Sequence, residues 1–211
     1  MQTGAGGRPR SLSPERNRNV ARVIARGIVA TLMFLPAWAG GAEPLESRLA
    51  ACLACHGEKG RSAVAETPSL GGQPSFYLTV QMLMFRDRLR VVEPMNAMMK
   101  GFSDGDLQKM GELIEKLPPP QSAGGSADPA RMETGRALAE RNRCNFCHQG
   151  SYSGERNVPR LAGQREDYLV KAMRAFKDNS RRGYDASMAD VLYEVSDEQI
   201  LDLAYFLSRL R

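Results

Sequence analysis

The chain has 211 residues, with 29 Lys and Arg against 24 Asp and Glu, and a formal net charge of +5. An excess of positive charge ordinarily raises the question of nucleic-acid binding. Here residues 1–42 hold six Arg and one acidic residue, so the remaining residues carry 23 basic and 23 acidic side chains. This balance excludes a general affinity for nucleic acid, and we expect no nucleic-acid partner.

The chain opens with the pattern of a secretory signal peptide. A short apolar run over residues 27–36 is followed by small residues at 37–42. The run is preceded by four arginines, which are Arg16, Arg18, Arg22 and Arg26. This predicts a signal peptide over 1–42 and export to the bacterial periplasm. The apolar run falls short of the ~20 residues of a spanning helix, so an uncleaved anchor with peripheral membrane association is the less favoured alternative.

The pattern Cys-x-x-Cys-His occurs twice, at residues 52–56 (CLACH) and 144–148 (CNFCH). Two thiols at this spacing can reach the two vinyl groups of one porphyrin, and the adjoining His can bind the iron as its proximal ligand. These motifs contain every Cys and His of the chain. They predict two covalently attached haem c groups. The expected ligating residues are Cys52, Cys55 and His56 in the first motif and Cys144, Cys147 and His148 in the second.

Disulfide bonds and zinc binding are the alternatives for four cysteines. A disulfide framework gives no reason for a His to follow the second Cys in both motifs. A zinc site usually places its two Cys-x-x-Cys units within about 20 residues of each other, and here they lie far apart. Haem attachment behind an export signal is therefore the favoured interpretation.

The two motifs lie in two copies of one longer pattern. Residues 67–73 (TPSLGGQ) match residues 158–164 (VPRLAGQ), and four residues after each terminal Gln comes Tyr-Leu. Internal similarity of this kind indicates a duplicated structural unit.

A linker rich in Pro, Gly and Ser covers residues 118–127. It predicts two domains, at residues 43–117 and 128–211, which are called repeat 1 and repeat 2 below. Each is small for a self-sufficient apolar core. A buried haem would supply the missing apolar bulk, so fold and cofactor should depend on each other.

The apolar spacing predicts an all-α fold with three helices in each repeat and no strand. Ser103 and Ser196 are expected to cap the last helix of each repeat, with Asp106 and Gln199 three residues further on. The first helix of repeat 1 is expected to be less complete than that of repeat 2. The predicted helices cover residues 45–54, 75–88, 104–117, 130–144, 165–178 and 197–210.

The sixth ligand of each iron follows by elimination. Both His are used as proximal ligands, so the distal position holds Met, another weak ligand or nothing. Met95 and Met188 each lie eight residues before a capping Ser, in segments predicted to be loops. A residue there can approach the iron from the face opposite the proximal His, so we expect Met95 and Met188 to be the axial ligands.

The other paired methionines, Met82 and Met173, lie inside predicted helices on an apolar face, where core packing is the better interpretation. Met98 and Met99 have no Met counterpart in repeat 2. They are expected to line the pocket, with either one as a fallback ligand for the first haem.

At this point the chain resembles the dihaem cytochrome c4 family and the related cytochrome c553-type proteins. The resemblance rests on residues 54–57 (ACHG), on the two PxLxGQ segments and on Phe85-Arg86. It rests further on Met95, Met188 and the two Ser-Asp caps. It implies two tandem class I cytochrome c domains related by a pseudo-twofold axis, with haem propionates facing across the interface. It also implies that the carbonyls of Pro68 and Pro159 accept the N–H of the proximal His. The segment 88–94 before Met95 is two residues shorter than its counterpart, which is a departure from the pattern.

His/Met ligation fills both axial positions, so such an iron passes single electrons and binds no substrate. The leading hypothesis is a non-enzymatic periplasmic electron carrier between a quinol-oxidising complex and a terminal oxidase. The second is a cytochrome subunit that accepts electrons from a dehydrogenase, such as a sulfide- or alcohol-oxidising enzyme. The third is a dihaem peroxidase, which the absence of a third His disfavours. Arg86, Arg88, Arg90 and Arg181-Arg182 are interpreted first as solvated side chains, and second as groups that attract an acidic partner or pair with propionates.

Overall fold

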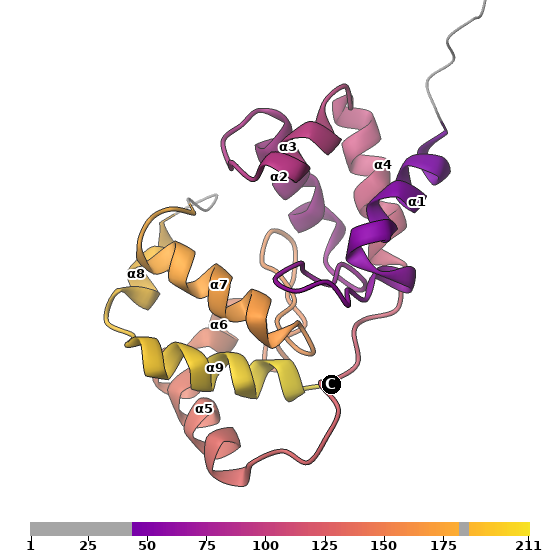
Figure 1. Cartoon of the computed structure of the whole chain (residues 1–211). Coiled ribbons are helices and arrows are strands. Elements are labelled where there is room, and N and C mark those ends of the chain that lie inside the picture. Colours follow the sequence, from indigo (N-terminus) through magenta and orange to yellow (C-terminus); the bar gives the residue numbers. More distant parts are fainter. Residues whose placement is uncertain (1–43, 182–185) are drawn as a thin grey trace, which may run out of the picture. The chain divides into compact units, whose positions relative to one another are not determined.

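The computed structural model describes residues 44–181 and 186–211, and Figure 1 shows the course of the chain. The predicted signal peptide, residues 1–42, lies outside the described residues. Within them the secondary structure is helical, with one isolated β-bridge between Glu155 and Val158 and no strand. None of the helices in these two segments has the length and apolar character that a membrane crossing requires.

All six predicted helices are present, with ends within a few residues of those expected. In repeat 1 the elements are α1 (Leu45–His56), the short 3-10 helix η1 (Glu58–Gly60), α2 (Ser75–Arg86), α3 (Glu93–Met99) and α4 (Asp104–Glu115). In repeat 2 they are α5 (Pro129–Arg141), α6 (Cys144–His148), α7 (Glu166–Lys177), α8 (Ser187–Tyr193) and α9 (Asp197–Arg209).

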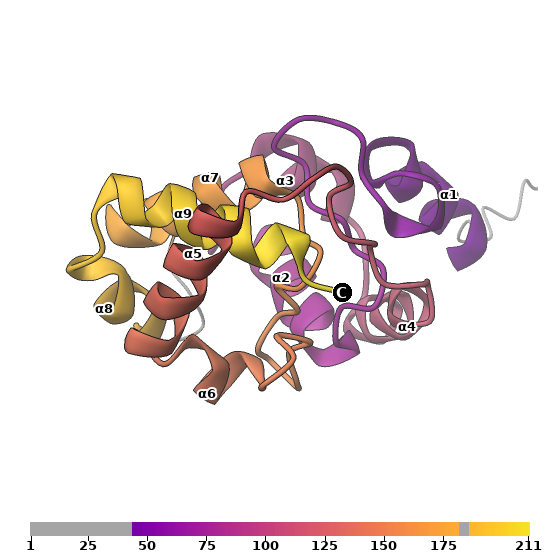
Figure 2. The same cartoon turned by 90° about the horizontal axis from the view of Figure 1, so that it is seen from below.

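Each repeat has an apolar cluster of its own. In repeat 1, α2 packs against α3 and α4. The buried residues there are Leu78, Met82, Phe85, Met99, Phe102, Leu107, Met110 and Ile114. In repeat 2, α9 packs against both α5 and α7 (Figure 2). The larger cluster around it includes Leu138, Leu169, Met173, Ile200, Leu203 and Phe206. The predicted core role of Met82 and Met173 is confirmed, since both are buried in these clusters.

The predicted caps of the last helices are also confirmed. Ser103 accepts from the backbone N–H of Asp106, whose carboxylate accepts from the backbone of Ser103 in return. Ser196 and Gln199 form the same reciprocal arrangement at α9. Each pair satisfies two backbone N–H groups that a helix start otherwise leaves free.

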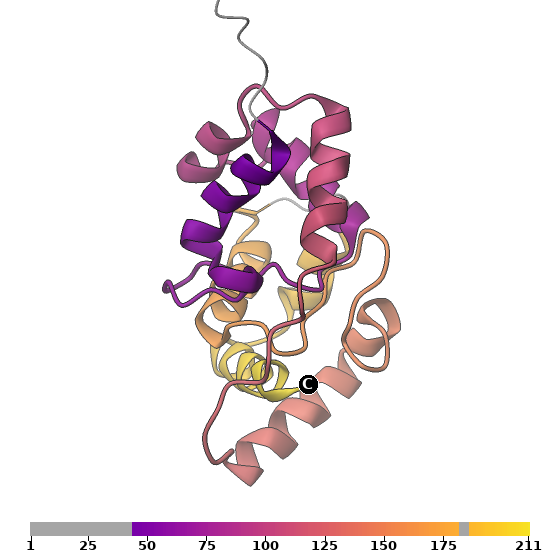
Figure 3. The same cartoon turned by 90° about the vertical axis from the view of Figure 1, so that its right-hand side faces the viewer.

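The first helices of the repeats differ, as expected. In α1 only Leu45 to Ala51 precede Cys52, and the helix continues through the haem motif to His56. In repeat 2 the whole of α5 precedes the motif, and Arg143 in a left-handed conformation (φ 53°) separates it from α6. The predicted helix 130–144 was therefore too long, because Arg143 interrupts it. Figure 3 shows α1 (indigo) beside α4, against which it packs over a short stretch.

The sequence missed two seven-residue helices, α3 and α8, because neither has a sustained apolar period. Pro94 in the first turn favours the start of α3. Asn96 then ties α3 to the preceding segment. Its side chain accepts from the N–H of Val92 (2.6 Å) and donates to the carbonyls of Phe85 (2.6 Å) and Arg90 (2.8 Å).

Candidate haem-binding sites

The two histidines have the same environment in both repeats. His56 ends α1 and is buried, and its Nδ1 lies 2.8 Å from the carbonyl oxygen of Pro68. His148 ends α6, is also buried, and has its Nδ1 2.8 Å from the carbonyl oxygen of Pro159. The expected proline contacts are thus present in both places.

These hydrogen bonds decide what each imidazole can do. A carbonyl oxygen only accepts, so Nδ1 carries the proton and Nε2 presents its lone pair. Burial lowers the pKa of His56 and of His148, and the hydrogen bond to the proline carbonyl offsets only part of this effect. Both rings are therefore held neutral and oriented, which is the form that binds a metal.

The four cysteines are free thiols. Cys55 and Cys147 are exposed, while Cys52 and Cys144 are half-buried, and burial raises the pKa of the Cys52 and Cys144 thiols. Among residues 44–181 and 186–211, no group of three or more His, Cys, Asp or Glu is placed to hold a metal ion. Two thiols and one oriented imidazole per repeat fit covalent haem.

Met95 and Met188 occupy helices rather than the loops that the sequence predicted, because α3 and α8 form there. Both are half-buried and pack at the edge of the apolar cluster of their own repeat. Met99 is fully buried in the repeat 1 cluster, and Met98 is 41% exposed. Met95 and Met188 thus keep equivalent positions in the two repeats, and Met98 and Met99 do not share them.

Two of the arginines named from the sequence, Arg90 and Arg181, form a cluster. Arg90 and Arg181 each follow a residue with positive φ, Arg88 and Asn179 respectively, after the equivalent helices α2 and α7. Each guanidinium stacks on the Phe of its own repeat, with 4.6 Å from Arg90 to the ring centroid of Phe85 and 4.5 Å from Arg181 to that of Phe176. This equivalence shows that the duplication extends to the Arg positions.

Arg90 and Arg181 meet at Gln81, which accepts from Arg90 Nη1 (2.7 Å) and Arg181 Nη2 (3.3 Å). Arg181 also donates to the hydroxyl groups of Tyr77 (3.2 Å) and Tyr168 (3.4 Å). Burial raises the pKa of Tyr168, but the charges of Arg181 and Arg90 outweigh it and lower that pKa overall. In the described part of the chain no carboxylate pairs with either arginine. The cluster therefore suits an anionic group such as a haem propionate.

The other arginines named from the sequence have ordinary surface roles. Arg86 pairs with Asp87 (2.8 Å) and Asp104 (2.6 Å), and Arg88 pairs with Glu93 (2.7 Å). Exposed pairs of this kind contribute little to stability. Arg182 lies outside the described residues.

The repeats contact each other through the glutamines that end the two matching segments. The Gln73 side chain donates to the carbonyl of Arg160 and accepts from its N–H, both at 2.9 Å. The Gln164 side chain does the same with Ser69, at 2.8 Å for both bonds. Since Ser69 and Arg160 are repeat equivalents, the contact is reciprocal. The repeated Gln was visible in the sequence, but its backbone partner in the other repeat was not.

Comparison with known proteins agrees with this geometry. The family model described as cytochrome c matches residues 132–211. A thiosulfate dehydrogenase electron acceptor of Thiomonas intermedia (strain K12) is 32% identical over 203 residues, which cover 89% of this chain and 90% of that protein. Cytochrome c4 of Azotobacter vinelandii is 29% identical over 82% of this chain and 90% of its own length. The chain belongs to the dihaem cytochrome c4 family.

A crystal structure of a cytochrome c4 supports the same conclusion. Reduced recombinant cytochrome c4 from Pseudomonas stutzeri has a TM-score of 0.70 and 27% identity, with 82% of this chain and all of that chain covered. The predicted fold class is thereby confirmed, as tandem class I cytochrome c folds made of helices. The two covalently attached haem c groups of a cytochrome c4 correspond to the two Cys-x-x-Cys-His motifs of this chain.

Proposed function

We propose that this cytochrome c4 homologue is a periplasmic carrier of single electrons, not itself an enzyme, between a quinol-oxidising complex and a terminal oxidase. Residues 43–117 and 128–211 form its two haem domains, joined by the linker 118–127. The first iron is bound by His56 and Met95, and the second by His148 and Met188. The observation that carries the proposal is the duplicated hydrogen bond from a buried His Nδ1–H to a proline carbonyl, at 2.8 Å in each repeat.

The side chains of the protein keep the surroundings of each haem iron the same in both oxidation states. Bound haem supplies a one-electron iron couple, and His/Met ligation favours a high reduction potential. His56 and His148 are fixed in one tautomer by Pro68 and Pro159, so little rearrangement accompanies a change of charge. Methionine in both distal positions leaves no open site for a substrate. This arrangement suits electron transfer and opposes peroxidase chemistry.

A redox-titrated absorption spectrum of the holoprotein tests the proposal. The wild type is expected to show two haems per chain, low-spin ferric iron and the far-red band of a Met–iron(III) bond. Met188→Ala should remove that band from the second haem alone, and Met95→Ala from the first alone. Met98→Ala is the matched control and should leave both bands intact. Loss of neither band in the Met95 and Met188 variants, or a high-spin component in the wild type, would contradict the carrier proposal.

A second candidate function is that of an electron acceptor for a periplasmic dehydrogenase. It is favoured by the 32% identity to a protein named thiosulfate dehydrogenase electron acceptor, which is similar over nearly its full length. The range of oxidisable donors to consider then extends from sulfide and alcohols to thiosulfate. Gel filtration of the native protein from cells grown on each donor separates the candidates. Co-elution with a dehydrogenase supports the acceptor role, and elution as a free protein supports the carrier role.

A further inference from the structure

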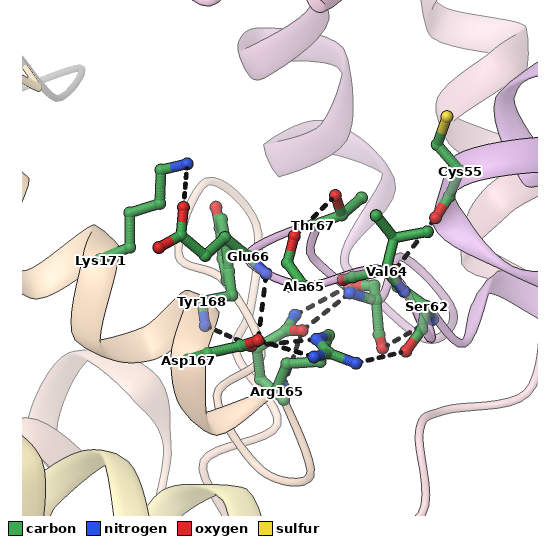
Figure 4. A network of polar contacts seen from close by, with 12 residues as sticks. Cys55, Ser62, Val64, Ala65, Glu66, Thr67, Arg165, Asp167, Tyr168 and Lys171 are labelled. Carbon is green, nitrogen blue, oxygen red and sulfur yellow. Dashed lines mark hydrogen bonds and ion pairs between the residues drawn. The ribbon is translucent and has the colours of Figure 1, made fainter.

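The loop over residues 62–69 carries Pro68, whose carbonyl accepts the proton of His56. Figure 4 shows the part of this loop from Ser62 to Thr67. Within repeat 1, the hydroxyl of Ser62 donates to the carbonyl of Cys55 (3.0 Å), and the N–H of Ser62 donates to the hydroxyl of Ser69 (3.2 Å). Ser62, at the start of the loop, is therefore bonded both to the haem motif and to Ser69, at the end of the loop. The position of the Pro68 carbonyl depends on how the middle of the loop is held.

Repeat 2 holds the loop at three further points. Arg165 Nη1 donates to the carbonyl of Ser62 (3.1 Å), and the carboxylate of Asp167 accepts from the N–H of Glu66 (3.1 Å). Gln164 binds the backbone of Ser69 through the pair of hydrogen bonds described above. These contacts bracket Pro68 on both sides in the sequence, as Figure 4 shows for Ser62 and Glu66.

Arg165 and Asp167 also hold each other. Arg165 Nη2 lies 2.6 Å and Nε 3.0 Å from the two carboxylate oxygens of Asp167, so the pair is bidentate. Lys171 adds an ion pair to the Glu66 side chain at 2.9 Å. Glu66 has a φ of 55°, in the left-handed region that a Glu adopts only when its surroundings impose it. The brace from repeat 2 is thus placed at the strained point of the loop.

The equivalent loop of repeat 2, residues 153–160, is braced in a different way. Glu155 and Val158 exchange two backbone hydrogen bonds (3.0 and 2.9 Å), and the N–H of Gly154 donates to the carbonyl of His148 (3.1 Å). The repeat equivalents of Arg165 and Asp167 are Pro74 and Phe76, which have no charged group. Among the described residues, the hydrogen bonds from repeat 1 to this loop are those of Gln73 to Arg160.

We propose that Arg165 and Asp167 are positioning residues for the first haem, acting from repeat 2 through the loop that presents Pro68 to His56. The hydrogen bond at Nδ1 sets how strongly an imidazole donates to its metal. The donor strength of His56 therefore depends on the contacts of Arg165 and Asp167 with its loop, and His148 has no equivalent of these two contacts. This inference rests on the proposed role of His56 as an iron ligand.

The test uses the full-length holoprotein and the variant Arg165→Gln. Nuclear magnetic resonance measures the exchange rate of the Nδ1 proton of each proximal His, and spectroelectrochemistry measures both midpoint potentials. For His56 we expect exchange to be about tenfold faster, as for the loss of one charge-assisted hydrogen bond. The potential of the first haem should rise, because a less firmly hydrogen-bonded imidazole is a weaker donor to ferric iron. The exchange rate of His148 and the second potential should stay unchanged.

Two further variants make the result specific. Arg174→Gln is the matched control, because Arg174 lies in α7 and pairs with Asp197 of its own repeat, and it should change neither haem. Asp167→Asn keeps the size of the side chain and should reproduce a smaller shift at the first haem alone, even where Arg165→Gln folds poorly. Equal values in Arg165→Gln and Arg174→Gln would overturn the proposal, as would equal shifts at both haems. Failure of the proposed ligation would be seen separately, as a missing Met–iron(III) band or a high-spin component in the absorption spectrum of the wild type.

Discussion

The two repeats share one sequence pattern but are stabilised in different ways. Repeat 2 places thirteen buried residues in its apolar cluster, and repeat 1 places eight. The long helix α5 packs along α9, whereas α1 contacts α4 only over a short stretch. The proximal loop of repeat 2 is closed by its own backbone, and that of repeat 1 by side chains of repeat 2. Both repeats therefore keep the Cys-x-x-Cys-His motif and the His–proline hydrogen bond, whereas the contacts that support them differ.

Truncation of equivalent core residues should have the largest effect on stability, and it tests whether the two repeats are unequally supported. Ile200 in α9 and Leu107 in α4 are fully buried and lie at matching distances from their capping serines. Truncation of either to Ala should lower the free energy of unfolding by about 2–5 kcal/mol. Contacts from repeat 2 support the proximal loop of repeat 1. Ile200→Ala should therefore broaden the unfolding transitions measured at both haems, and Leu107→Ala only the transition measured at the first. Denaturant unfolding followed separately at each haem checks this. Unfolding confined to repeat 2 in Ile200→Ala would show that repeat 1 is independent.

A smaller effect is expected at the crossing of α5 and α9. A Cβ added to Gly135 would lie 2.4 Å from the carbonyl oxygen of Asp202 and 2.4 Å from the Cβ of Phe206. Gly135→Ala should therefore force the helices apart and destabilise repeat 2 by about 1–3 kcal/mol. Gly150→Ala is the control, since a Cβ there meets nothing within 4 Å. Thermal unfolding of both variants measures the difference, and similar midpoints would show that the crossing tolerates the methyl group.

The helix caps should be the point at which the repeats behave alike. Ser103 and Ser196 form the same capping box at α4 and α9. Replacing either Ser by Ala should cost about 1 kcal/mol. Measured by urea unfolding, Ser103→Ala and Ser196→Ala should shift the transition of their own repeat by similar amounts. A much larger loss for Ser103→Ala would mean that repeat 1 is closer to its stability limit than its core suggests.

The sequence was sufficient where the physics is local. The six longer helices follow from apolar periodicity, and both caps follow from Ser with Asp106 or Gln199 three residues on. The helices α3 and α8 could not be found this way, because their support comes from contacts such as those of Asn96 with a distant backbone. Met95 and Met188 occupy equivalent short helices instead of the predicted loops, and their role as iron ligands stays a prediction.

Contacts between the repeats were beyond the sequence for a different reason. Gln73 and Gln164 recur at matching positions, but each pairs with backbone that is about 90 residues away, as in the Gln73–Arg160 pair. Arg165 and Asp167 have no counterpart in repeat 1, so the repeat pattern itself directs attention away from them. Periodicity and duplication reveal what the two halves share. The residues that make them unequal become visible only when the halves are placed together.

The smallest expected effect concerns the pH dependence of the brace between the repeats. Hydrogen bonds from Arg165 lower the pKa of Asp167 below its ordinary value of 3.8. A carboxyl whose pKa is lower in the folded protein contributes stability that is complete above the unfolded value and is lost as the pH falls through the folded one. Because the Asp167 side chain is 37% exposed, the contribution should be only about 0.5 kcal/mol.

The unfolding midpoint of the wild type should therefore exceed that of Asp167→Asn at pH 5, and the difference should shrink as the pH falls below 3.8. Asp178→Asn is the control, because the Asp178 carboxylate caps Ser180 within repeat 2 and does not reach the loop. A difference that persists unchanged at pH 3 would mean that Asp167 acts through packing, and that its charge does not hold the repeats together.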